Sequence, residues 1–310
     1  MRLVTTVIAV IVLGAASSIA AAGTSALFIG NSFTYGWGSP VRFYRAHTVT
    51  DLNGEGIGGV PALFKSFTVQ AGLEYDVYLE TRSGSGLDFH LLNKRDLIAT
   101  RPWDIVVMHG HSMLDLQRPG DPTKLIETTR QMVDFLRGRN PSIAIHLTAT
   151  WSRADQVYRG NGPWAGKPVD TMAQDVRTAY DKAAAGAPGV KGVIPVGEAW
   201  TRAIRTGVAD PNPYDGIDAG KLNLWTYDAY HASTHGYYLE ALVVFGTLTK
   251  RDPRSLGETE CSAFELGLSR PETKALQQIA FDELVRTESV APAPVVSAKP
   301  GEPARCTDAR

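Results

Sequence analysis

The chain has 310 residues and carries 31 Lys and Arg side chains against 32 Asp and Glu side chains, a formal net charge of −1 at pH 7. No basic cluster stands out, and phosphate binding needs a concentrated basic surface, so the composition argues against nucleic acid as the main partner. The length suits one large α/β domain or two small ones. Two cysteines, Cys261 and Cys306, are too few for a disulfide-rich scaffold. In an exported protein they either pair, tying the tail to the body, or stay free, and both alternatives are open.

The first 22 residues have the pattern of an export signal. Arg2 precedes an apolar run over residues 3–16, and Ala20 and Ala22 form an A-x-A cleavage pattern before Gly23. The run is shorter than the roughly 20 residues that a membrane span needs, and no second such run follows. We therefore expect signal cleavage, no stable membrane span afterwards, and a secreted or periplasmic protein. Retention of the segment as an N-terminal anchor is the alternative.

Short apolar runs typical of strands alternate with helical patterns along the rest of the chain. The predicted strands are 26–30, 75–81, 104–108, 143–149 and 192–196, and the predicted helices are 60–71, 123–139, 169–185, 198–206, 236–249 and 272–287. Nearly all-apolar strands alternating with helices indicate a parallel sheet covered on both faces. The sequence thus predicts an α/β domain over residues 23–289, a three-layer α/β/α sandwich with a five-stranded parallel sheet. Residues 290–310, rich in Ala and Pro, are predicted to be a flexible tail.

Ser32 follows directly on the first predicted strand. In an open parallel sheet ligands bind beyond the carboxyl ends of the strands, and Gly30 permits a tight turn there. A hydroxyl on such a turn, with free backbone N–H groups beside it, is a candidate nucleophile. The alternative is that Ser32 caps a following helix.

Asp228 precedes His231 by three residues. At this spacing the carboxylate can fold back and accept a hydrogen bond from the ring Nδ1–H. That bond fixes the tautomer in which Nε2 is free to take a proton from a serine. The alternative is structural: Asp228 caps a turn and His231 is simply exposed.

These two segments together resemble the SGNH (GDSL-like) hydrolases. The resemblance covers about residues 25–252 and is carried by residues 28–34 (FIGNSFT), by Asp228-x-x-His231 and by the following ASTHGYYL, which look like a bacterial exported branch of that superfamily. It implies a flavodoxin-like strand order 2-1-3-4-5. It also implies acyl transfer, in which Ser32 attacks an ester carbonyl, His231 serves as general base and then general acid, and Asp228 orients it. No metal or organic cofactor is implied.

The resemblance further implies an oxyanion hole built from the N–H of the nucleophile, a glycine N–H after the second strand and an asparagine side chain after the third. Gly84 is predicted as the glycine donor, with Gly86 as the alternative, because glycine lets backbone approach a substrate closely. In the asparagine position this chain has Ser112, a shorter and weaker donor. His109 or His111 are alternative donors. This departure bears on the rate and the substrate range and leaves the nucleophile and its base unchanged.

Several aromatic residues fall in predicted loops and suggest a carbohydrate surface. The tryptophans concerned are Trp37, Trp151, Trp164 and Trp225. Aromatic faces stack on sugar rings, although tryptophans are also common packing residues. Trp37, His111, Trp151 and Arg153 are the predicted substrate contacts, which favours O-acetyl carbohydrate esters among substrates that also include small acyl and lipid-derived esters. A non-catalytic carbohydrate-binding module on the same fold is the second functional hypothesis.

Two further patterns are open to other chemistry. The pairs His109/His111 and His231/His235 allow a metal-dependent hydrolase, although the second pair lacks the Glu that follows the first His in zinc protease helices. Residues 54–59 match G-x-G-x-x-G, yet the polar segment before them makes a poor buried strand. A glycine loop is therefore expected there, and no dinucleotide site.

Overall fold

The structure is a computed structural model that describes residues 23–292. One sheet of six parallel strands has the order β2-β3-β1-β4-β5-β6. The strands are β1 (Thr24–Gly30), β2 (Thr50–Asp51), β3 (Tyr75–Thr81), β4 (Ile105–Met108), β5 (Ala144–Thr148) and β6 (Val190–Ile194). The five predicted strands are present in the predicted order 2-1-3-4-5. The predicted number is corrected to six by β2, a two-residue edge strand too short to leave a periodic signal in the sequence.

Helices flank this sheet. They are α1 (Gly59–Gln70), α2 (Leu87–Asn93), α3 (Arg95–Ile98), α4 (Thr123–Arg139), α5 (Thr171–Ala185), α6 (Val196–Arg205), α7 (Thr234–Thr249), α8 (Cys261–Glu265) and α9 (Arg270–Arg286). Short 3₁₀ turns lie at η1 (Pro40–Phe43), η2 (Ala46–Thr48) and η4 (Pro253–Leu256), and a π turn at η3 (Asp155–Arg159). The predicted helices correspond to α1, α4, α5, α6, α7 and α9, with ends within two residues. The short α2, α3 and α8 were not predicted.

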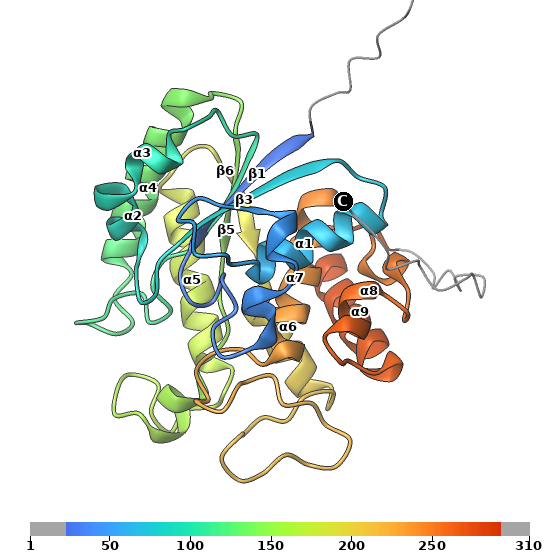
Figure 1. Ribbon diagram of the computed structural model, residues 1–310. Helices are drawn as coiled ribbons and strands as arrows, with labels where there is room; N and C mark the ends of the chain where they lie inside the picture. Colours follow the sequence, from blue (N-terminus) through green and yellow to red (C-terminus); the bar gives the residue numbers. More distant parts are fainter. Residues whose placement is uncertain (1–22, 293–310) are drawn as a thin grey trace, which may run out of the picture.

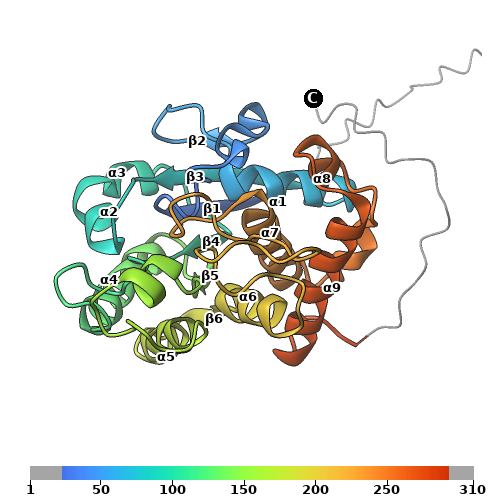
Figure 2. The same cartoon turned by 90° about the horizontal axis from the view of Figure 1, so that it is seen from below.

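The helices form two layers, one on each face of the sheet. Seen along the strands, α2, α3, α4 and α5 cover one face, and α1, α6, α7, α8 and α9 cover the other (Figure 2). Strand β1 illustrates why residues 26–29 are all apolar: Ala26 and Phe28 enter one core, while Leu27 and Ile29 enter the other. Because successive side chains of a strand point to opposite faces, a strand covered on both sides has no polar face. The predicted three-layer α/β/α sandwich is confirmed.

The ends of the described chain bear on the predicted domain limits. Val290 is buried and belongs to the same apolar core as α9, so the predicted tail begins with a residue packed on the domain. The predicted export signal, Cys306 and residues 293–310 lie outside the described residues. Cys261 is buried at the start of α8. Over residues 23–292, no helix is both long and apolar enough to cross a membrane.

All strands run in one direction, so their carboxyl ends share one edge, at the lower side of Figure 1. The connections after β4, β5 and α6 gather there. Within the described chain, residues 206–233 between α6 and α7 form neither helix nor strand. This segment nevertheless carries Asp228 and His231, and the sheet edge brings it to the end of β1.

Candidate active site

The turn that carries Ser32 starts where β1 ends. A Cβ atom at Gly30 would collide with the Thr34 hydroxyl and the His109 ring, so glycine is required there. The Asn31 side chain closes the turn by accepting a hydrogen bond from the Phe33 N–H at 3.1 Å. The next helical turn, η1, is capped by Ser39. Ser32 is therefore a turn residue, not a helix cap.

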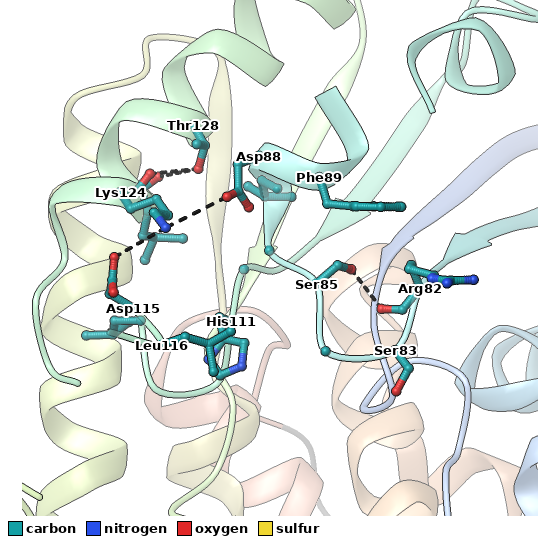
Figure 3. Close-up of a pocket in the computed structure, with 16 residues that line it drawn as sticks. Arg82, Ser83, Ser85, Asp88, Phe89, His111, Asp115, Leu116, Lys124 and Thr128 are labelled. Carbon is teal, nitrogen blue, oxygen red and sulfur yellow. Dashed lines mark hydrogen bonds and ion pairs between the residues drawn. The ribbon is translucent and has the colours of Figure 1, made fainter. Parts of the chain in front are cut away.

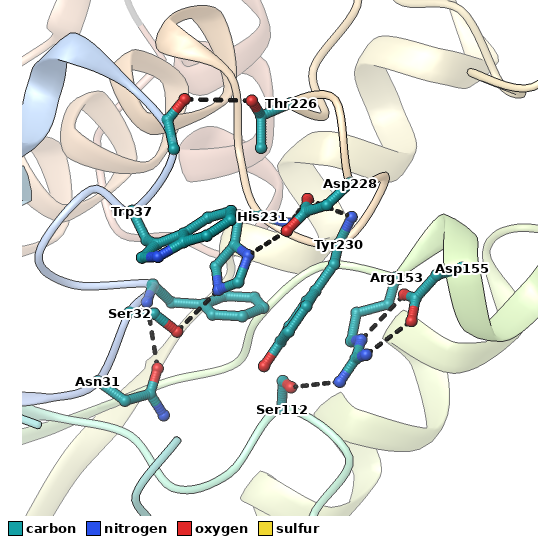
Figure 4. Close-up of polar contacts among 12 residues, drawn as sticks. Asn31, Ser32, Trp37, Ser112, Arg153, Asp155, Thr226, Asp228, Tyr230 and His231 are labelled. Atoms are coloured by element: carbon teal, nitrogen blue, oxygen red, sulfur yellow. Dashed lines mark hydrogen bonds and ion pairs between the residues drawn. The ribbon is translucent and has the colours of Figure 1, made fainter. Parts of the chain in front are cut away.

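Ser32, His231 and Asp228 form one line of hydrogen bonds (Figure 4). The Ser32 Oγ lies 2.8 Å from His231 Nε2, and His231 Nδ1 lies 2.7 Å from Asp228 Oδ2. Since a carboxylate only accepts, Nδ1 carries the proton and Nε2 is left to accept from the serine hydroxyl. The three side chains have the relative geometry of a nucleophile, its base and the group that orients the base.

Local backbone geometry places the Asp228 carboxylate. Ala229 adopts a left-handed conformation with φ of 55°, which turns the chain back on itself. Asp228 Oδ1 then accepts from the N–H groups of Tyr230 at 3.0 Å and His231 at 2.9 Å, leaving Oδ2 for the imidazole. Burial acts to raise the pKa of Asp228, but the hydrogen bonds from His231 and the backbone outweigh it and hold the pKa below its usual value. The carboxylate is thus charged at neutral pH.

Aromatic rings surround the His231 imidazole. Trp37 and Tyr230 pack against it with ring centroids at 4.4 and 3.9 Å, and Phe33 lies at 5.5 Å. Trp37 is partly exposed, and its other neighbour, Tyr227, is 82% exposed with ring centroids 5.7 Å apart. Trp37 therefore stands where a predicted substrate contact belongs, beside the imidazole.

The other predicted aromatic contacts are in the interior. Trp151 is 0% exposed and stacks between Phe33 at 4.2 Å and Trp200 at 4.5 Å. Trp164 and Trp225 are buried as well. This corrects the prediction that Trp151 contacts substrate: it supports Phe33 from the core side of the site.

Arg153 is also buried, and its charge is already matched. It forms a bidentate ion pair with Asp155, in which Nε donates to Oδ1 at 3.0 Å and Nη2 donates to Oδ2 at 2.6 Å. Its guanidinium lies 3.4 Å from the centroid of the Tyr230 ring, and Nη1 donates to the Ser112 hydroxyl at 3.4 Å. Arg153 thus holds Ser112 and Tyr230 in place, which accounts for its burial better than the predicted contact with substrate.

The three polar residues after β4 differ in what they can still donate. Burial lowers the pKa of His109 to about 4, so its ring is neutral at pH 7. Its Nδ1–H donates to the Gly110 carbonyl at 2.9 Å and its Nε2 accepts from Thr34 at 2.7 Å, which uses both nitrogens. Ser112 only accepts from Arg153, so its own hydroxyl proton is available.

His111 retains one available donor. Burial, and then the positive charge of Arg153, lower its pKa to about 4. Its Nδ1 accepts from the Met113 N–H at 3.2 Å, which places the proton of the neutral ring on Nε2. No hydrogen bond joins that Nε2–H to another residue in the described part of the chain. His111 also lines a pocket of about 240 Å³ between the loop after β3 and the start of α4 (Figure 3).

The loop after β3 lies against the Ser32 turn. The Asn31 amide donates to the Ser85 carbonyl at 2.9 Å and to the Gly110 carbonyl at 3.3 Å, so it bridges both neighbouring loops. Gly84 has φ of 67°, and a Cβ atom built on it meets open space, whereas one on Gly86 would clash with Asp88. Among residues 23–292, the N–H groups of Ser32 and Gly84 have no hydrogen-bond acceptor.

Asn31 and Tyr230 were not predicted from the sequence as members of the site. Each directly precedes a predicted residue, Ser32 or His231, and that adjacency was the available signal. The hydroxyl of Tyr230 is directed toward the space between Ser32 and Ser112 (Figure 4).

The histidines of the second pair considered as metal ligands are engaged with other side chains of the protein. Both nitrogens of His231 bond to Asp228 and Ser32, while His235 Nε2 lies 3.5 Å from Glu272. Among the described residues, no group of three or more His, Cys, Asp or Glu side chains is arranged to hold a metal ion.

Comparison with solved structures places the fold. A DUF4886 family protein from Bacteroides uniformis matches with a TM-score of 0.59 and 19% identity over 86% of this chain and 97% of its own. A protein classed as a GDSL-like lipase from Parabacteroides merdae matches with a TM-score of 0.52 and 15% identity over 72% and 94%. A protein classed as an SGNH hydrolase from Slackia heliotrinireducens matches with a TM-score of 0.48 and 21% identity over 73% of this chain and 99% of its own. By sequence, no protein-family model and no curated protein matches the chain. The chain has the fold of the SGNH (GDSL-like) hydrolases, as its end motifs indicated.

Proposed function

We propose that this protein is an exported serine esterase that hydrolyses short acyl esters through Ser32, His231 and Asp228. The observation that carries the proposal is the unbroken line of hydrogen bonds from Asp228 through His231 to Ser32, at 2.7 and 2.8 Å. Export rests on the pattern of the first 22 residues. The solved structure classed as a GDSL-like lipase, which shares the fold, supports ester chemistry.

In this mechanism His231 Nε2 takes the Ser32 proton as Oγ attacks the ester carbonyl. The tetrahedral intermediate collapses, and the imidazolium gives the proton to the departing alkoxide, leaving an acyl-serine. Water then attacks the acyl group, with His231 again as base, and the carboxylic acid leaves. The ionised Asp228 stabilises the imidazolium in both halves.

Charge on the intermediate needs preorganised donors. We assign the N–H groups of Ser32 and Gly84, which bond to no acceptor in the described part of the chain, and the Ser112 hydroxyl, whose proton Arg153 does not use. One such donor is typically worth a factor of about 10²–10³ in kcat. The serine in place of an asparagine makes the third donor the weakest of the set.

For the substrate we propose O-acetyl or other short acyl esters of carbohydrates. Trp37 and the 82% exposed Tyr227 offer adjacent aromatic surface beside His231 on which a sugar ring can stack. The pocket lined by His111 and Lys124 adds polar groups next to the loop after β3. No cofactor takes part in the proposed chemistry.

The test compares hydrolysis of p-nitrophenyl acetate and of acetylated oligosaccharides by the protein, by Ser32→Ala and by Ser142→Ala. Ser142 is an exposed serine in the turn before β5, at the amino ends of the strands and thus away from Ser32. A fluorophosphonate label is located in parallel by peptide mass spectrometry. We expect turnover and a label on Ser32, both lost only in Ser32→Ala. Turnover that survives in Ser32→Ala contradicts the proposal, and binding of glycans without turnover or label favours the non-catalytic module.

A further inference from the structure

A second carboxylate–imidazole–hydroxyl chain lies in the interior, outside the Ser32 group. The Glu80 carboxylate bonds to His90 Nδ1, and His90 Nε2 lies 3.0 Å from the Ser85 hydroxyl. Glu80 and His90 are both 0% exposed. Glu80 sits near the end of β3, His90 in α2, and Ser85 in the loop between them, so the chain spans the whole β3–α2 connection.

Proton directions show that Ser85 is not a second nucleophile. The Ser85 hydroxyl donates to the Arg82 carbonyl at 2.7 Å, because a carbonyl only accepts. Its oxygen must therefore accept from His90, which places a proton on Nε2. Because the Glu80 carboxylate also only accepts, His90 donates from both ring nitrogens, to Glu80 and to Ser85, and is not a base for Ser85.

The same network holds the loop from the outer side. Asn53 donates to Glu80 Oε1 at 3.3 Å and to the Thr81 carbonyl at 3.1 Å, and Lys94 donates to Asn53 at 2.7 Å. A buried carboxylate–imidazole pair is costly to desolvate unless its remaining polar atoms are bonded, and here they are. A well-satisfied buried network of this kind fixes local conformation.

What it fixes is the backbone beside Ser32. The Arg82 N–H donates to the Gly30 carbonyl at 3.0 Å, and the Ser85 carbonyl accepts from Asn31 at 2.9 Å. Between these two attachments lies Gly84, whose N–H has no acceptor among residues 23–292 and whose φ of 67° is available to glycine at low cost. Glycine on a loop has wide conformational freedom, so its N–H direction depends on its neighbours being held.

We propose that Glu80, His90 and Ser85 are positioning residues that hold the loop at residues 82–86 so that the Gly84 N–H faces the oxyanion formed at Ser32. This inference rests on the proposed esterase function. The Ser85 hydroxyl is the direct link, because it is bonded both to His90 and to the Arg82 carbonyl at the start of the loop.

The test uses Ser85→Ala, which deletes this link, and Ser85→Thr, which keeps a hydroxyl. The control is Ser25→Ala. Ser25 is a buried serine near the amino end of β1, away from the carboxyl ends of the strands, and its hydroxyl bonds to Asp104 at 2.7 Å. For each variant we measure kcat and KM for p-nitrophenyl acetate, the rate of fluorophosphonate labelling at Ser32 and the Tm.

Loss of a whole oxyanion donor lowers kcat about 10²–10³-fold, so a misdirected one should lower it roughly 10- to 100-fold. We expect that fall in Ser85→Ala with KM within about twofold, because the oxyanion contact is made only in the transition state. Labelling at Ser32 should slow in parallel, and Ser85→Thr should recover at least half of the loss on a logarithmic scale. Ser25→Ala should lower Tm comparably and leave kcat unchanged.

Three results would overturn the inference in an active enzyme: kcat in Ser85→Ala within twofold of the parent, an equal fall in Ser25→Ala, or a label on Ser85. Failure of the esterase proposal looks different, since the parent protein then neither turns over nor labels at Ser32.

Discussion

Asp228→Asn is expected to lower kcat about 10⁴-fold while leaving the fold intact. Asp228 Oδ1 accepts two backbone N–H groups, at 3.0 and 2.9 Å, and Oδ2 accepts from His231 Nδ1 at 2.7 Å. In the variant the amide oxygen must stay on the two N–H groups, because the opposite orientation sets NH₂ against both donors. The amide NH₂ then faces Nδ1.

That contact forces the wrong tautomer on His231. Facing a donor, Nδ1 gives up its proton, which moves to Nε2, and Nε2 can no longer accept from Ser32. In serine hydrolases a wrong tautomer of this kind costs about 10⁴ in kcat. At about 1.4 kcal/mol per tenfold change, this corresponds to roughly 5.5 kcal/mol of transition-state stabilisation.

The assay compares kcat for p-nitrophenyl acetate in Asp228→Asn and in the control Asp115→Asn. Asp115 builds the same kind of turn, with Oδ1 accepting from Gln117 at 2.7 Å and from Arg118 at 2.9 Å. Its Oδ2 faces Lys124 at 3.5 Å, and no histidine of the described residues bonds to it. We expect kcat of Asp115→Asn within threefold of the parent. A loss below 100-fold in Asp228→Asn, with unchanged Tm, would refute the tautomer argument.

Three further predictions follow from the described contacts. Since the pKa of His109 in the folded protein is lowered to about 4 from an unfolded value near 6.5, its contribution is fully present above pH 6.5 and is lost as pH falls toward 4. This contribution amounts to roughly 3 kcal/mol of unfolding free energy. Urea titrations between pH 6.5 and 4 should show the loss, and the pH dependence should be smaller in His109→Gln. Trp151→Ala should destabilise the fold by about 3–5 kcal/mol in the same titrations, because Trp151 is fully buried between two rings; a change below 1 kcal/mol would contradict that packing. Trp37→Ala should keep the parent Tm within about 3 °C yet lower kcat/KM for acetylated oligosaccharides more than for p-nitrophenyl acetate, and equal losses on both substrates would argue against a sugar platform.

Much of the architecture was predictable because strands and helices each leave a local pattern of apolar residues in the sequence. The strand that ends at Gly30 is apolar on both faces, and the helix over residues 123–139 matches α4 at both ends. The pairing of Asp228 with His231 was equally accessible, since a spacing of three residues lets a carboxylate fold back on the ring. Ser32 is brought to them by the topology of a parallel sheet, which sequence pattern also indicates.

The remaining features depend on contacts between distant segments. Whether a tryptophan faces solvent or core depends on its neighbours, and Trp151 is enclosed by Phe33 from one loop and Trp200 from α6. Glu80 stands in a strand whose pattern alone assigns no partner to its charge. The histidine that bonds to it arrives from α2, a helix of seven residues that was too short to be predicted.

The two halves of the proposed catalyst are secured with different strength. Ser32 lies in the turn directly after a central strand, whereas His231 lies 199 residues later on a segment with neither helix nor strand. Just after this segment, the Tyr237 hydroxyl of α7 donates to the carbonyls of Ser32 and Trp37 at 3.1 and 3.2 Å. Irregular segments open locally at a lower free energy than sheets unfold. Heating should therefore separate base from nucleophile while the sheet is still paired, and thermal inactivation should precede the loss of circular dichroism. Recovery on cooling then requires this segment to return to the Ser32 turn, so activity reports on the stability of the segment and not on that of the sheet.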